Sequence, residues 1–259
     1  WTCDTSTTST QAQTAIDSST DGAVITFNAG TYSSWGNGDI TFSMSKSTTL
    51  LCATIGGCSI GGTGIWGMYT TCSGTSDKVY RISGFSFTGA NNPRIWFYGE
   101  TACTLNKIRI DNNTFTSTSG EPTFMYFGAA GEFGSLDNYY HGVIDNNTFT
   151  CTNSCMMVEM IQKSIGVPRG SENRPIHGPG TWQNMFFEDN TLTVTTQTNT
   201  GQGALDGYGG HGHVFRFNSV TNSRVLMHGT DAGHVFGPRN FEVYKNTITQ
   251  NAGSLLDDG

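Results

Sequence analysis

The sequence predicts a single all-β domain folded as a right-handed parallel β-helix, a solenoid of short strands with a small capping helix at its N-terminal end. Two observations predict this fold. A short segment recurs without gaps through the second half of the chain, and apolar residues flank its centre in every copy. The composition agrees, because 34 glycines and a charged fraction of only 13% suit short strands joined by many tight turns.

The repeat is centred on an asparagine. Five segments carry it: IRIDNNTFT (108–116), VIDNNTFT (143–150), FFEDNTLT (186–193), FRFNSVT (215–221) and VYKNTIT (243–249). Their central residues are Asn113, Asn147, Asn190, Asn218 and Asn246, at intervals of 34, 43, 28 and 28 residues. Upstream, RISGFSFTG (81–89) matches with Phe85 at the asparagine position, again 28 residues before Asn113. One coil therefore takes about 28 residues, and the longer intervals contain loops.

Two apolar columns accompany the asparagine. The residues three positions before it are Ile110, Ile144, Phe187, Phe215 and Val243, and those two positions after it are Phe115, Phe149, Leu192, Val220 and Ile248. No helical period of 3.6 residues is present, and 28 residues are too many for one strand and a turn. We therefore expect several strands per coil, each pairing in parallel with its equivalent in the next coil, and both columns inside.

The asparagines themselves are predicted to be structural. Stacked about one strand spacing apart, roughly 4.8 Å, each amide can donate to one neighbour and accept from the other. Such a ladder suits a buried bend, where an unpaired amide would be costly.

The N-terminal segment TQAQTAIDSSTDGAVITFNAGTY (10–32) contains a short amphipathic helix, a turn at Asp21-Gly22, a strand and a glycine turn. It closely resembles the opening of pectate-lyase-like β-helices, and the resemblance extends over the asparagine coils. We expect one domain over 1–259, with residues 1–32 forming the cap and the first coil. That fold hosts lyases, hydrolases, esterases, adhesins and phage spikes, so it does not by itself imply an activity.

Charge and composition limit the partners. The chain carries 13 basic and 20 acidic residues, a net charge of −7, so no nucleic acid is expected to bind. It contains no run of about 18 apolar residues, so no membrane span is expected. It begins at Trp1 without methionine, as does a mature secreted protein, and we expect a secreted or surface location. AGSLLDDG (252–259) follows the last coil directly, so a second copy or further chain is expected to cover this open end.

Seven cysteines also favour an oxidising compartment. Cys52–Cys58 and Cys151–Cys155 are the disulfides that we expect, each closing a small loop. Cys72 with Cys103 is a weaker prediction, and Cys3 is left over. No CxxC pair supports a zinc site.

A polar column lies two residues before the ladder asparagines and contains Asp111, Asp145 and Glu188, followed by Arg216 and Tyr244. Strand alternation points it outward. Three stacked carboxylates would repel one another unless a cation or Arg216 neutralises them, and oxygen ligands from neighbouring coils suit Ca²⁺, so these residues are candidate Ca²⁺ ligands. The alternative is a set of solvated surface acids without a site.

The richest candidate site lies in DGYGGHGH (206–213) and RVLMHGTDAGHVFGPR (224–239). Its candidate catalytic residues are Asp206, His211, His228, Asp231 and Arg239. Counted from the ladder, Glu159 and Asp231 fall on similar stretches of their coils, so Glu159, His228 and Asp231 are expected to share a face. A histidine beside a carboxylate can act as a general base near neutral pH. The alternative is that these are turn residues, with His213 packed inside the coil.

The insertion IQKSIGVPRGSENRPIHGPG (161–180) accounts for most of the extra length of the 43-residue coil. Long loops on rigid scaffolds often carry binding function. We expect Lys163, Arg169 and His177, with Arg216 and Glu159, to contact an anionic sugar, although plain surface elaboration explains the loop equally well.

Two classes of function follow. The first is an extracellular enzyme acting on a polysaccharide or surface glycan, foremost a lyase that cleaves an acidic glycan by β-elimination. Here His228 or His211 is the base, Arg239 and Arg216 neutralise the uronate, and Asp231 or Asp206 holds a metal or orients the base. A hydrolase using Asp206 and Asp231 is the variant. The second class is non-catalytic: an adhesin, a virion spike or a filament subunit.

Overall fold

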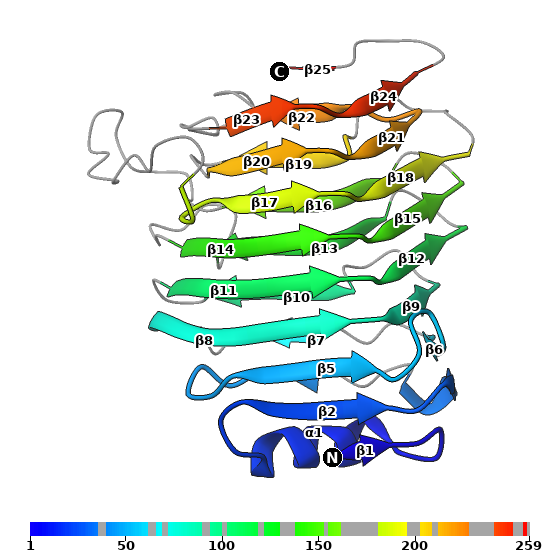
Figure 1. Cartoon of the computed structure of the whole chain (residues 1–259), viewed down its shortest axis with the longest axis vertical. Helices are drawn as coiled ribbons and strands as arrows, with labels where there is room; N and C mark the ends of the chain where they lie inside the picture. The colour runs from blue at the N-terminus through cyan, green and yellow to red at the C-terminus, as the bar shows by residue number, and fades with distance from the viewer. Residues whose placement is uncertain are drawn as a thin grey trace.

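The computed structural model describes residues 1–35, 40–61, 66–68, 72–89, 94–99, 103–118, 122–129, 138–152, 155–161, 181–195, 203–208, 212–227, 241–250 and 256–257. Within these ranges the chain winds through three parallel sheets, visiting the first, second and third in turn in each coil (Figure 1). This is the right-handed parallel β-helix that the repeat predicts, and it is the fold that the resemblance to pectate-lyase-like proteins implies.

The strands of each sheet follow one another in sequence order along the solenoid axis. The first sheet contains β1 (Thr2–Cys3), β2 (Ala23–Phe27), β5 (Thr48–Cys52), β8 (Gly74–Ser83), β11 (Cys103–Asp111), β14 (Asn138–Asp145), β17 (Met185–Glu188), β20 (His213–Arg216) and β23 (Phe241–Tyr244). The second contains β3 (Gly30–Tyr32), β6 (Cys58–Ile60), β9 (Phe85–Thr88), β12 (Thr114–Ser117), β15 (Thr148–Cys151), β18 (Thr191–Val194), β21 (Ser219–Thr221) and β24 (Thr247–Thr249). The third contains β4 (Ile40–Thr41), β7 (Trp66–Met68), β10 (Ile95–Gly99), β13 (Thr123–Ala129), β16 (Met156–Ile161), β19 (Leu205–Tyr208), β22 (Val225–Met227) and β25 (Leu256–Asp257).

The two predicted apolar columns line the interior. Ile110, Ile144 and Phe187 are register partners on the first sheet and are fully buried. On the second sheet, Phe115 stacks on Phe149 with ring centroids 4.8 Å apart and nearly parallel planes. Because each coil repeats the same inward positions, the core is a set of apolar stacks one strand spacing apart.

The first helix closes the N-terminal end of the coil (Figure 1). In α1 (Ser9–Ser18), the Thr8 hydroxyl accepts from the backbone of Gln11, and the Gln11 side chain accepts from the backbone of Thr8. The buried face of α1 consists of Ala12, Ala15 and Ile16. The Lys46 ammonium donates to the last carbonyls of α1, at 2.6 Å from that of Ile16, which stabilises the C-terminal end of the helix. A 3₁₀ turn, η1 (Ser33–Trp35), follows β3.

Each bend that precedes a ladder asparagine, between the first and second sheets, contains one non-glycine residue in the left-handed region. These residues are Asn112, Asn146, Asp189, Phe217 and Lys245, with φ between 54° and 58°. Asparagine and aspartate tolerate this conformation better than other residues with side chains, which explains the first three of them. In every case the next residue is the ladder asparagine.

The asparagines form the hydrogen bonds expected of a ladder. The Asn147 Oδ1 accepts from the Asn113 backbone amide at 2.9 Å and from the Asn113 Nδ2 at 3.1 Å. The Asn190 and Asn218 side chains repeat the arrangement one coil further on each time. Asn147 and Asn190 are both buried, at 1% and 2% exposure, so these bonds satisfy amides that water cannot reach.

The disulfides Cys52–Cys58 and Cys151–Cys155 are present, as predicted, and so is Cys72–Cys103. Cys3 is a buried free thiol. In the part of the chain that the structure describes, no helix is long and apolar enough to cross a membrane.

Candidate functional site

The outer face of the third sheet brings together residues from four coils. Trp96 on β10, Tyr126 on β13, Glu159 on β16 and Asp206 on β19 occupy one register column. The residues on either side of this column point inward and are fully buried, such as Met125. Strand alternation therefore places the column on the outside of the coil.

Three aromatic rings form the lower part of this face. Trp96 packs edge-on against Tyr98 at 5.5 Å and against Tyr126 at 5.4 Å between ring centroids. Tyr98 and Tyr126 lie 6.4 Å apart. All three side chains are partly exposed, so the cluster presents apolar ring surface to the outside while its mutual packing fixes the ring positions.

A glycine makes room for the cluster. A Cβ on Gly128 would collide with the ring of Tyr126, whose outward side chain lies across it. From inside the coil, the Tyr140 hydroxyl on β14 donates to the Gly128 carbonyl at 2.6 Å. Burial raises the pKa of Tyr140 well above its usual value, so it remains a neutral donor. This hydrogen bond fixes β13, the strand that carries Tyr126, from the interior of the coil.

Two carboxylates continue the column. Glu159 and Asp206 are direct register partners on β16 and β19, about one strand spacing (roughly 4.8 Å) apart at the backbone. Glu159 is half-buried and Asp206 is 4% exposed. Adjacent carboxylates can accept hydrogen bonds from hydroxyl groups, act as an acid and a base, or share a cation.

Two of the residues predicted from sequence, Glu159 and Asp206, are therefore brought together on one face. The partners expected for them, His211, His228, Asp231 and Arg239, lie outside the described residues, as do Lys163, Arg169, His177 and the insertion from residue 162 to 180. Arg216 does not join the pair, because it lies on β20 in the first sheet. His213 is fully buried inside the coil, and burial lowers its pKa to about 3.

The acidic column of the first sheet is not a solvated calcium site. Asp111 is fully buried, and Arg81 donates to both of its oxygens at 2.7 Å. Arg109 forms a second ion pair, with Asp145 at 3.0 Å. Burial alone would raise the pKa of Asp111, but the hydrogen bonds from Arg81 and Ser83 hold it below its usual value.

The third member of that column, Glu188, accepts from Arg216, which also donates to the Tyr244 hydroxyl at 2.9 Å. The prediction that Asp111, Asp145 and Glu188 bind Ca²⁺ is therefore wrong, because guanidinium groups already neutralise them. Among the described residues, no three histidine, cysteine or acidic side chains lie close enough to hold a metal ion.

The aromatic cluster was not predicted from the sequence. A signal was present, since Trp96 and Tyr98 alternate with apolar residues in IWFYG (95–99), and Tyr126 does so in TFMYFG (123–128). These positions fall between the ladder segments, where loop lengths vary from coil to coil. The asparagine repeat therefore did not align them with Glu159.

The fold and this face define a parallel β-helix protein with an aromatic and acidic outer surface on its third sheet. No family model matches the chain, and no curated protein matches it. Among solved structures, the chain is similar to an alginate lyase from Paenibacillus sp. str. FPU-7, at 14% identity and a TM-score of 0.42, over 100% of this chain and 97% of that one. It is also similar to a PL6 family polysaccharide lyase from Pseudopedobacter saltans, at 13% identity and a TM-score of 0.29, over 95% of this chain and 73% of the other.

Proposed function

We propose that the outer face of the third sheet binds an acidic polysaccharide and that the protein is an extracellular lyase that cleaves this polysaccharide by β-elimination. The observation that carries the proposal is the stacking of Glu159 and Asp206 beside the cluster of Trp96, Tyr98 and Tyr126. Rigid rings next to a few polar groups are typical of ligand sites, in which the apolar surface contributes affinity and the polar groups fix orientation.

The register column of Trp96, Tyr126, Glu159 and Asp206 indicates how the glycan would lie on the protein. A chain lying along the solenoid axis would pass from the rings of β10 and β13 to the carboxylates of β16 and β19, one coil at a time. The sheet holds these side chains at fixed spacing, so little ordering is needed when the glycan binds. In this proposal, sugar faces rest on the aromatic cluster and the scissile bond lies over Glu159 and Asp206.

Elimination needs a base to remove the C5 proton, an acid to protonate the leaving oxygen, and neutralisation of the uronate carboxylate. The C5–H bond and the C4–O bond break while a double bond forms between C4 and C5. We assign Glu159 and Asp206 to orientation of the uronate and of the base. His228 or His211 remains the proposed base, with Asp231 as the alternative orienting group and Arg239 as a neutraliser. Lys163, Arg169 and His177 remain proposed glycan contacts.

Two carboxylates would repel an acidic glycan unless a cation intervenes. Glu159 and Asp206 supply the hard oxygen donors that Ca²⁺ takes, and the remaining ligands would come from water and the glycan. When bound there, the ion would neutralise the uronate carboxylate. Removal of divalent ions with a chelator should then weaken glycan binding, and added Ca²⁺ should restore it.

Three disulfides in the described part of the chain support an oxidising compartment. The experiment that tests the proposal is an assay of the purified protein against a panel of acidic polysaccharides, read as the ultraviolet absorbance of unsaturated uronates. Product from at least one uronate polymer, and none from neutral glucans, is the expected result. No product from any polymer would reject the lyase and favour the non-catalytic class.

A further inference from the structure

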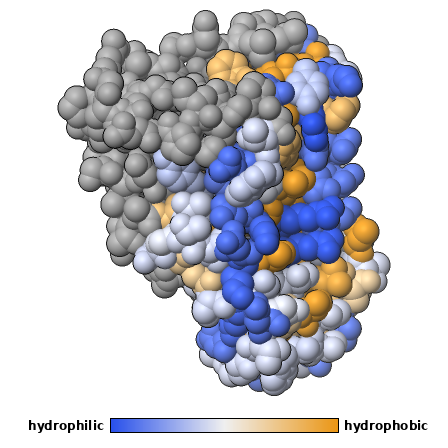
Figure 2. Space-filling model, turned by 60° about the vertical axis from the view of Figure 1, so that its left-hand side comes forward, coloured by the Kyte–Doolittle hydropathy of each residue, from blue (hydrophilic) through white to orange (hydrophobic). Residues whose placement is uncertain are grey.

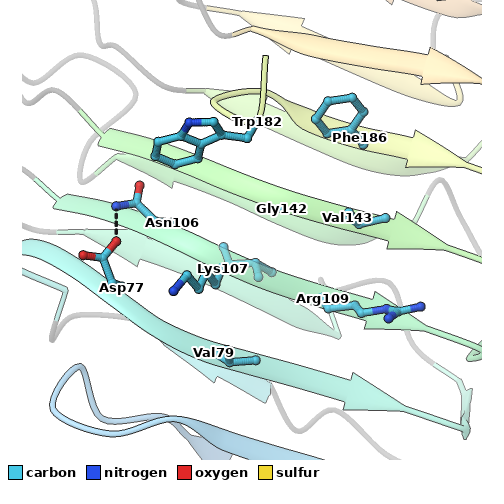
Figure 3. Close-up of a pocket in the computed structure, with 10 residues that line it drawn as sticks. Asp77, Val79, Asn106, Lys107, Arg109, Gly142, Val143, Trp182 and Phe186 are labelled. Carbon is cyan, nitrogen blue, oxygen red and sulfur yellow. Dashed lines mark hydrogen bonds between the residues drawn. The ribbon is translucent and has the colours of Figure 1, made fainter. Parts of the chain in front are cut away.

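A groove of about 830 Å³ crosses the outer face of the first sheet, over β8, β11, β14 and β17 (Figure 3). Val143 and Phe186 lie in it, Trp182 lies at one side, and Lys107 and Arg109 extend from β11. Figure 2 shows this side of the molecule, where hydrophilic side chains surround smaller apolar patches. The groove lies on a different sheet from Glu159 and Asp206 and shares no residue with them.

The backbone beneath the groove is irregular. The register of β11 shifts against both neighbouring strands after Leu105, so the pairing is interrupted at Asn106. On β14, Gly142 pairs with Ile108, and a Cβ on it would collide with the Ile108 carbonyl, so only glycine fits there without a shift of the backbone. The register shift and this glycine lie together in the floor of the groove.

A chain of polar contacts supports the aromatic side of the groove. The Asn106 amide donates to the Asp77 carboxylate at 2.7 Å, and its oxygen lies 2.9 Å from the His141 Nδ1. Because Asn106 uses its nitrogen for Asp77, the His141 Nδ1 carries the proton in this contact. The buried His141 ring then meets Trp182 edge-on, 5.8 Å between centroids. Trp182 is thus positioned although 62% of it is exposed.

Two cationic side chains of β11 line the groove in a protein of net charge −7. Lys107 is exposed and forms no ion pair with the described part of the chain. Arg109 uses Nε and Nη2 for Asp145, and its Nη1 has no hydrogen-bond partner among the described residues. Among the described residues that line the groove, Asp77 is the one acidic residue, and its carboxylate accepts a hydrogen bond from Asn106.

We infer that this groove is a second, non-catalytic binding site for an acidic glycan. One sugar stacks on the exposed ring of Trp182, and uronate carboxylates pair with the Lys107 ammonium and the free Nη1 of Arg109. An exposed tryptophan above an apolar floor, with cations along one side, complements an anionic sugar chain. Binding in this groove does not require catalysis at the third sheet. It would keep a polysaccharide bound to the protein while the proposed active site on the third sheet cleaves it.

The test measures affinity for oligouronates by isothermal titration calorimetry, on the wild-type background and on the Glu159→Gln background. Trp182→Ala and Lys107→Gln should each weaken binding roughly tenfold, the cost of losing one aromatic or charged contact. Their matched controls are Trp1→Ala, which removes an equally exposed tryptophan (68%), and Lys245→Gln, which removes an exposed lysine of the last coil. Both controls should leave the affinity unchanged.

The Lys107→Gln effect should also shrink at high salt, whereas the Trp182→Ala effect should persist. Unchanged affinity in Trp182→Ala and Lys107→Gln would overturn the inference, even if the protein proves to be a lyase. Equal loss for neutral and acidic oligosaccharides would overturn its charge component. Lost affinity in a protein without lyase activity would support this site and reject the proposed function instead.

Discussion

Glu159 and Asp206 are register partners on β16 and β19, so two carboxylates from neighbouring coils lie side by side on the outer face of the third sheet. The next residue down this column is Tyr126, and the one below it is Trp96. A solenoid converts residues distant in sequence into neighbours at fixed spacing, because each coil contacts only the coils beside it. This is how residues 47 positions apart come to share a site.

The ladder provides a prediction about stability. Asn190→Ala leaves the backbone amide of Asn147 without its acceptor and removes the donor to the Ile144 carbonyl. Because these groups are buried, we expect the free energy of unfolding to fall by about 1–3 kcal/mol. Urea denaturation measures it. Asn146→Gly is the control, since it keeps the left-handed bend and removes an exposed amide that donates only to the Asp145 carboxylate. Equal losses for both variants would show that the ladder bonds are not the cause.

His213 provides a prediction about pH. Its folded pKa, about 3, lies below the usual value of 6.5, because burial disfavours the charged ring. As the pH falls below 6.5, the unfolded chain therefore binds a proton that the folded chain does not. The stability contribution is complete above pH 6.5 and is lost progressively toward pH 3, by about 1.4 kcal/mol per pH unit.

His213→Leu should remove this component. The pH dependence of the free energy of unfolding, compared between the two proteins, should differ by about one proton over that range. Identical slopes would mean that His213 does not remain neutral in the folded protein.

The aromatic cluster provides a prediction about glycan binding. In Gly128→Ala, the new Cβ meets the ring of Tyr126, and the ring must shift because it is the mobile partner. We expect weaker glycan binding with little change in the free energy of unfolding. Calorimetric titration with oligouronates measures it. Gly61→Ala is the control, because a Cβ there meets nothing within 4 Å. Unchanged affinity in Gly128→Ala would show that the glycan does not rest on Tyr126.

The sequence predicts the features that every coil repeats. The asparagine, its two apolar neighbours and the bend keep the same positions relative to one another in every coil that carries them. The burial of these side chains therefore follows from strand alternation. The small disulfide loops and the capping helix depend on nearby residues and are also predictable.

Features formed only once were not predicted. Arg81 and Arg109 are register partners that pair with Asp111 and Asp145, but this arginine column does not continue into the later coils, so the acids were interpreted as metal ligands. The groove lies over a register shift in β11, which leaves no signature in the hydrophobic pattern. The position of Trp182 depends on its contact with His141, which in turn contacts Asn106, and the sequence does not show that these three residues lie together.

The measurement that tests the central claim most directly is the rate of unsaturated uronate release by Glu159→Gln and Asp206→Asn. The control is Asp17→Asn, which removes one charge from an exposed residue of α1. We expect each site variant to lose at least about 99% of the rate, since losing a group that orients the reaction costs roughly 3 kcal/mol or more. Asp17→Asn should keep the wild-type rate, and unfolding midpoints should confirm that all three variants fold. Wild-type rates in folded Glu159→Gln and Asp206→Asn would contradict the claim that this face of the third sheet is the active site.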